Sequence, residues 1–133
     1  MSKTLCAAVT ALLLAAMRLW AHHSFAAAYD EKNLITVTGV VTSFKWINPH
    51  AWLYIDGKDV SGKSARWGFE MGAPGGLLSR GWKKAELKKG DHVTVEGYRA
   101  KNNGDTANAR TVTVPDGRKL FGGFKETPGN PFK

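Results

Sequence analysis

The 133-residue chain contains a single cysteine, Cys6, close to its start. If the first 21 residues are removed, as argued below, the remaining chain has no thiol. It can then form neither a disulfide nor a thiolate metal site, and it has no cysteine nucleophile. Other catalytic motifs are missing too: there is no Gly-x-Ser-x-Gly, and residues 72–76 lack the lysine of a phosphate-binding loop. We therefore expect a binding protein rather than an enzyme.

Only one long apolar run is present, from Leu5 to Met17, preceded by Lys3 and followed by a small residue, Ala21. This order is typical of a secretory signal, and the run is short for a membrane span. Residues 1–21 are therefore predicted to be a signal peptide, which makes the mature protein periplasmic or secreted.

Two cleavage positions remain open. A cut after Ala21 leaves His22 as the first residue, although Leu19 stands where a small residue is usual. A cut after Ala26 would remove both His22 and His23. The distance from the apolar run favours Ala21.

Acidic residues are fewer than basic ones. Removal of residues 1–21 leaves 112 residues with 17 lysines and arginines against 11 acidic residues, a net charge of +6. Such a surplus attracts nucleic acid, anionic lipid or acidic polymers. Export makes nucleic acid an unexpected partner. A protein that is soluble after signal removal could still have an envelope protein partner, and its oligomeric state stays open.

Alternation of β-branched and polar residues predicts an all-β domain over residues 22–121. Strands are expected at 34–46, 50–56, 65–71, 92–99 and 109–114, with a short edge at 119–121 and a helix at 75–80. Gly39, inside the first strand, indicates a bulge or bend. A helix between strands 3 and 4 is the order of a five-stranded, OB-like β-barrel; a small sandwich is the alternative. Residues 122–133, rich in glycine and proline, are expected to be a flexible tail.

Three histidines suggest a metal site. A chain that starts at His22 offers an imidazole and an α-amine, and His23 or the distant His50 would add another imidazole. A nitrogen-rich set of this kind suits copper, and a further carboxylate such as Glu70 would make zinc the alternative. Solvated N-terminal histidines, with His50 bonded to the backbone of its Asn48-Pro49 corner, are the other explanation. We expect the fourth histidine, His92, to have a structural role or to be exposed.

Aromatic residues suggest a second kind of site. Trp52 and Tyr54 share one face of the second strand with His50, and Trp46 comes just before the corner. Such residues could stack on a ligand with flat or sugar-like groups. In a small barrel they could equally pack in the core and rim.

The motif HHSFAAAYD (residues 22–30), followed by ITVTGVVTSFKWINPHAW (residues 35–52), resembles a family of small exported bacterial proteins of unknown function. The segments WGFEMGAPGGLLSRGW (67–82), KKGDHVTVEGYRAKNN (88–103) and ANARTVTVPDGRKLF (107–121) are similar to the same family. The resemblance covers nearly the whole mature chain and implies a secreted, single-domain β protein. It implies no activity.

Overall fold

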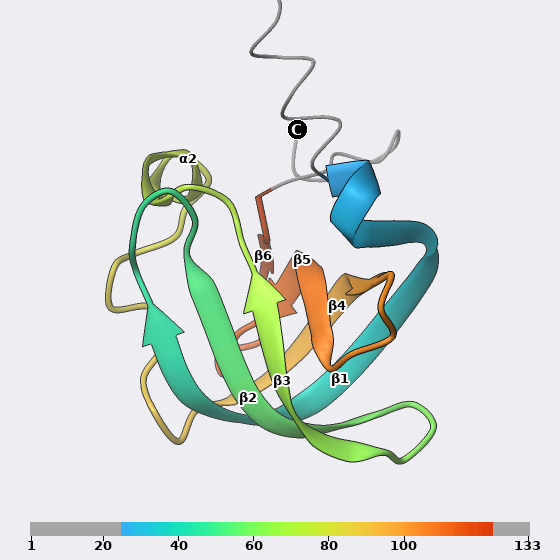
Figure 1. Cartoon of the computed structure of the whole chain (residues 1–133). Helices are drawn as coiled ribbons and strands as arrows, with labels where there is room; N and C mark the ends of the chain where they lie inside the picture. Colours follow the sequence, from blue (N-terminus) through green and yellow to red (C-terminus); the bar gives the residue numbers. More distant parts are fainter. Residues whose placement is uncertain (1–24, 124–133) are drawn as a thin grey trace, which may run out of the picture.

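Alternating apolar residues build the six strands of the computed structural model, which describes residues 25–123 (Figure 1). After a helical turn at residues 25–28, the elements are β1 (Tyr29–Lys45), β2 (Trp52–Asp59), β3 (Ser64–Glu70), α2 (Pro74–Leu78), β4 (His92–Ala100), β5 (Thr106–Thr113) and β6 (Lys119–Phe121). The short helix α2 has Pro74 in its first turn, where the missing N–H of proline costs nothing.

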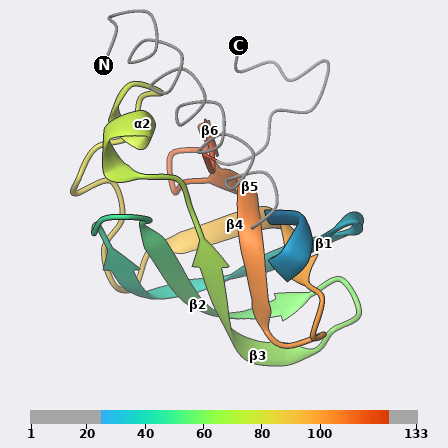
Figure 2. The same ribbon diagram turned by 45° about the horizontal axis from the view of Figure 1, so that its top comes forward.

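The sheet closes on itself. Neighbouring strands pair antiparallel in the order β3-β2-β1-β4-β5-β6, and β3 also pairs with β5 in parallel. This last pairing runs from Gly68↔Thr106 to Glu70↔Asn108 and joins five of the strands into a ring (Figure 2). We call the β3–β5 pairing the closure seam.

The inside of the ring holds a continuous apolar core. Ala51, just before β2, and Leu53 and Ile55 within it are fully buried, while the residues between them face outward, as the sequence pattern predicts. Each large apolar side chain buried in this way contributes about 1.5–3 kcal/mol to folding. The other fully buried core side chains include Val37, Val41, Val95, Val112, Trp67, Phe69, Met71, Leu77 and Trp82.

The expected fold class is confirmed in its main lines: the chain is mostly antiparallel β, with a short helix between the third and fourth strands. The sheet has six strands instead of five, because β6 pairs with β5 through Val112↔Leu120 and its neighbours. The first strand was predicted to begin at Leu34 but begins at Tyr29. Its pairing with β4 jumps from Tyr29↔Ala100 to Leu34↔Tyr98, so the polar residues between them interrupt the alternation.

Of the two features predicted at Gly39, a bulge or a bend, the bulge is not found there. The β1–β2 register shifts between Val41 and Ser43, so Thr42 is the extra residue. Gly39 lies opposite Gly57, and a Cβ on Gly39 would come within 2.2 Å of the Asp56 carbonyl oxygen. Glycine is required here because the two backbones approach closely, which lets β1 and β2 cross tightly.

The predicted tail starts inside the fold. Gly122 donates its backbone N–H to the carbonyl of Arg110 (2.7 Å) and accepts from the N–H of Gly72 (2.8 Å). Residues 124–133 and the predicted signal peptide lie outside the described part of the chain. Within residues 25–123, no helix has the length and apolar character needed to cross a membrane.

Candidate functional site

A row of outward-facing residues crosses the closure seam. Trp52 of β2 pairs with Glu70 of β3, Glu70 pairs with Asn108 of β5, and Asn108 pairs with Tyr98 of β4. Because directly paired residues in a sheet project to the same side, these four side chains are neighbours on the outer face. The seam therefore brings together residues that are up to 56 positions apart in the sequence.

Glu70 holds two side chains at once. Its Oε1 lies 2.5 Å from Nδ1 of His50, and its Oε2 accepts a hydrogen bond from the hydroxyl of Tyr29. An ionised carboxylate only accepts hydrogen bonds, so a contact of this kind favours the tautomer of His50 that carries its proton on Nδ1. Nε2 is the ring nitrogen of His50 that does not face Glu70. We call Tyr29, Glu70 and His50 the Tyr–Glu–His cluster.

The three groups differ in exposure. The side chain of His50 is 36% exposed and that of Glu70 is 18% exposed, whereas Tyr29 is buried. Burial raises the pKa of Tyr29 well above its ordinary value, and the hydrogen bond to Glu70 and the charge of that carboxylate add to the effect. Tyr29 therefore stays a neutral donor, while the histidine lies at the surface.

The helical turn that leads into β1 packs over the same face. The ring of Phe25 lies 5.6 Å from that of Tyr29 and meets Tyr98 edge-on at 5.7 Å. The backbone N–H of Lys101 donates to the carbonyl of Ala28 at 2.9 Å. These contacts hold the first described residues of the chain beside Tyr29. Tyr29 and His50 both contact the carboxylate of Glu70.

Asn108 is the unusual member of the row. It is only 1% exposed, yet neither atom of its carboxamide has a hydrogen-bond partner within the chain as described. A buried polar group without a partner costs about 1–3 kcal/mol. Such groups are rare in folded proteins and commonly face a bound water or ligand.

The predicted aromatic site is only partly assembled. Trp52 and Tyr54 stack with ring centroids 6.0 Å apart and planes inclined by 16°, both half-buried. Gly68 lies beneath Tyr54, and Nζ of Lys45 lies 5.5 Å from the centre of its ring. Trp46 is not part of this pair: it packs edge-on against Phe44, on the core side of β1.

Of the predicted metal ligands, the structure describes only His50; His22 and His23 lie outside residues 25–123. Within that range, no group of three or more histidine, cysteine, aspartate or glutamate side chains could hold a metal ion. Glu70, considered as a further ligand, instead bonds to Nδ1 of His50. The fourth histidine, His92, is exposed at the start of β4, in line with its expected role.

Tyr29 and Asn108 were not singled out from the sequence. Tyr29 precedes a polar stretch that hides the start of β1, and an asparagine inside a short predicted strand carries no signal of its own. The one sequence feature that could have indicated a role for Tyr29 is the motif HHSFAAAYD, which contains it.

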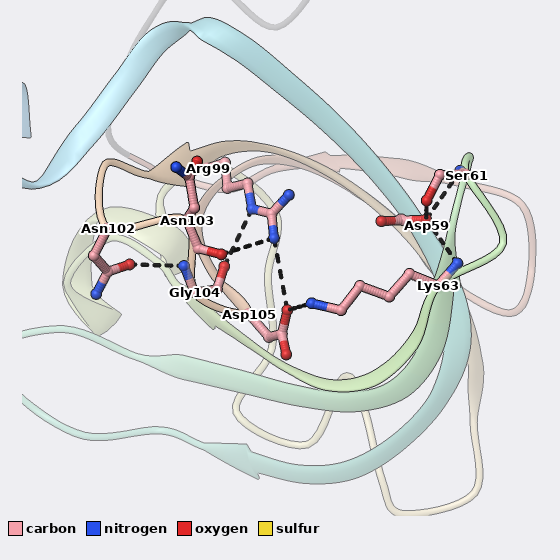
Figure 3. Close-up of polar contacts among 8 residues, drawn as sticks. All are labelled: Asp59, Ser61, Lys63, Arg99, Asn102, Asn103, Gly104 and Asp105. Atoms are coloured by element: carbon pink, nitrogen blue, oxygen red, sulfur yellow. Dashed lines mark hydrogen bonds and ion pairs between the residues drawn. The ribbon is translucent and has the colours of Figure 1, made fainter.

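The far end of the ring is closed by an ion-pair network (Figure 3). Asp105 lies between Nζ of Lys63 (2.5 Å) and the guanidinium of Arg99 (3.7 Å), and both cations approach the face of Trp67. Arg99 also donates to the carbonyls of Asn103 and Gly104. One carboxylate is thus shared by two cations, which lie over the face of Trp67.

The fold and the site together define a small β domain, closed by a parallel seam, with a Tyr–Glu–His cluster on its outer face. The chain belongs to the family described as "Family of unknown function (DUF6152)", whose match spans residues 9–109. That span includes the predicted end of the signal peptide, all four histidines and the closure seam. No curated protein and no solved structure gives a significant match.

Proposed function

We propose that the protein is exported, folds as an OB-like barrel and binds a transition metal, copper in preference to zinc. His22 would supply its imidazole and its α-amine, His50 would supply Nε2, and His23 would be a further ligand. The observation that carries this proposal is the bond between Glu70 and Nδ1 of His50. Histidines that bind metals commonly donate their other ring N–H to a carboxylate in this way.

The position of the first described residues supports the proposal that His22 takes part in the site. Phe25 packs on Tyr29, which shares Glu70 with His50. His22 comes three residues earlier, and three extended residues reach about 10 Å. The proposal requires His22 to approach His50 within this length while the packed turn stays in place.

The donor set decides the metal. An amine and two or three imidazoles favour copper, because nitrogen ligands in a planar arrangement suit Cu(II). Zinc usually takes four ligands in a tetrahedron, and the carboxylate that could complete one is already bonded to His50.

Mass spectrometry of the exported protein, followed by copper titration, tests this function. We expect a mature chain that begins at His22 and binds one copper ion. Replacement of His50 by alanine should weaken binding at least 10-fold, whereas His92→Ala, which removes an exposed histidine elsewhere, should leave it unchanged. A mature chain that begins at Ala27, or equal affinity in His50→Ala, would contradict the proposal.

A second candidate rests on the stacked pair of Trp52 and Tyr54. With Lys45 beside it, this half-exposed pair could bind a ligand with a flat face, or an envelope protein partner, without any metal. Binding would then survive a chelator and His22→Ala but fail in Trp52→Ala. Loss of ligand binding on chelation alone would rule out this alternative.

A further inference from the structure

We propose that Glu70 and Tyr29 are positioning residues of the histidine site: Glu70 sets the tautomer and orientation of His50, and Tyr29 ties Glu70 to the N-terminal turn. Packing of this turn and orientation of the histidine would then depend on each other. The inference deepens the proposed metal function and rests on it for its metal-binding consequences. Its structural part can be tested in the metal-free protein.

The argument begins with the two oxygens of Glu70. Oε1 lies 2.5 Å from Nδ1 of His50, and Oε2 accepts a hydrogen bond from the hydroxyl of Tyr29. A carboxylate with one hydrogen bond can rotate about its last torsion, whereas a carboxylate bonded at both oxygens has a fixed plane. The bond from Tyr29 therefore restricts the direction in which Glu70 meets the imidazole.

The backbone explains why Glu70 is a firm support. Glu70 lies at the end of β3, where it pairs with Trp52 of β2 on one side and with Asn108 of β5 on the other. A residue held on both sides by strands moves little. His50, by contrast, lies in the β1–β2 connection just before β2, so side-chain contacts, that with Glu70 among them, orient it.

Tyr29 connects the helical turn at residues 25–28 to Glu70. It is buried under Phe25, and the turn is fastened to β4 by the bond from the Lys101 N–H to the Ala28 carbonyl. The first described residues of the chain therefore pack beside the tyrosine that bonds to Glu70. A side chain held in this way needs less reorganisation when it binds a ligand.

Nuclear magnetic resonance of ¹⁵N-labelled, metal-free protein tests the tautomer. In the wild type, His50 should carry its proton on Nδ1. Glu70→Gln keeps the shape but removes the charge, so we expect a shift toward the Nε2–H form. Glu96→Gln is the matched control, because Glu96 also lies half-buried on the outer face but bonds to Thr111 instead. An unchanged His50 tautomer in Glu70→Gln would overturn the role of Glu70.

Tyr29→Phe tests the link to the turn. It preserves the ring that packs on Phe25 but removes the hydroxyl. A hydrogen bond to a charged group is worth roughly a 10-fold shift in a local equilibrium. We therefore expect amide exchange of Lys101, which reports on the turn, to be about 10-fold faster, together with a broader set of His50 ring signals. Unchanged exchange and an unchanged His50 would overturn the role of Tyr29.

Copper titration of the same variants separates this inference from the proposed function. Loss of an outer-shell partner typically weakens metal binding about 10–100-fold, so Glu70→Gln should lie in that range and Tyr29→Phe should weaken binding less. If the wild type binds no copper, the metal function fails, whereas the tautomer and exchange results still decide the positioning roles. If the wild type binds copper and Glu70→Gln binds equally well, the positioning role fails while the metal function stands.

Discussion

Replacement of Asn108 by leucine should stabilise the protein. The side chain of Asn108 is buried at the seam, and its two amide atoms lack partners within the described chain. Leucine has the same number and branching of side-chain heavy atoms and no polar atoms, so the substitution removes the cost of an unpaired buried group, about 1–3 kcal/mol. For a domain of this size, each kcal/mol raises the melting temperature by roughly 4–8 °C.

Chemical and thermal unfolding of Asn108→Leu, followed by circular dichroism, measures the effect. Thr111→Val is the matched control on the same strand: Thr111 is also nearly buried, but its hydroxyl donates to Glu96 at 3.1 Å, so its removal should bring no comparable gain. A fall in the free energy of unfolding of Asn108→Leu would refute the reasoning. It would mean that the amide has a partner, such as a bound water or ligand, in the native protein.

Two further predictions concern stability. Gly39→Ala should destabilise the protein by at least the upper end of the usual 1–3 kcal/mol for overpacking, about 3 kcal/mol, because the new methyl group meets the Asp56 carbonyl. Gly75→Ala, which points into open space, should be nearly neutral in the same denaturant titration. Hydrogen bonds from Ser61 and from the backbone of Lys63 keep the pKa of Asp59 below its ordinary value. The ionised Asp59 therefore stabilises the fold above about pH 4, and this stabilisation is lost as the pH falls through the lowered pKa. Asp59→Asn should therefore show a shallower loss of stability than the wild type in acid unfolding curves between about pH 5 and 2; parallel curves would count against this.

Much of the fold follows from local patterns. The strict alternation in His50–Asp56 predicts which side chains of β2 enter the core, and Pro74 predicts the helix between the third and fourth strands. The details that failed depend on contacts between distant segments. The sequence predicted a bulge or bend at Gly39, because the close approach of the Asp56 backbone is invisible in the sequence.

The site was predictable only in part. His50 stood out because it follows Asn48-Pro49 and opens the predicted second strand. Its contact with Glu70 was not predictable, because it depends on the β2–β3 register, which sets Trp52 opposite Glu70. Tyr29 reaches Glu70 only because β1 extends past its polar stretch. A single sequence contains no signal for that extension, so a cluster with members at 29, 50 and 70 emerges only from the folded chain.

The most direct test of the metal site compares two forms of the protein by copper titration. One begins at His22, and the other keeps a single additional residue, the native Ala21, in front of it. The added residue leaves every imidazole in place but moves the α-amine away from the His22 side chain. We predict that the form with Ala21 binds copper at least 10-fold more weakly. Equal affinity of the two forms would contradict a site built on the N-terminal histidine.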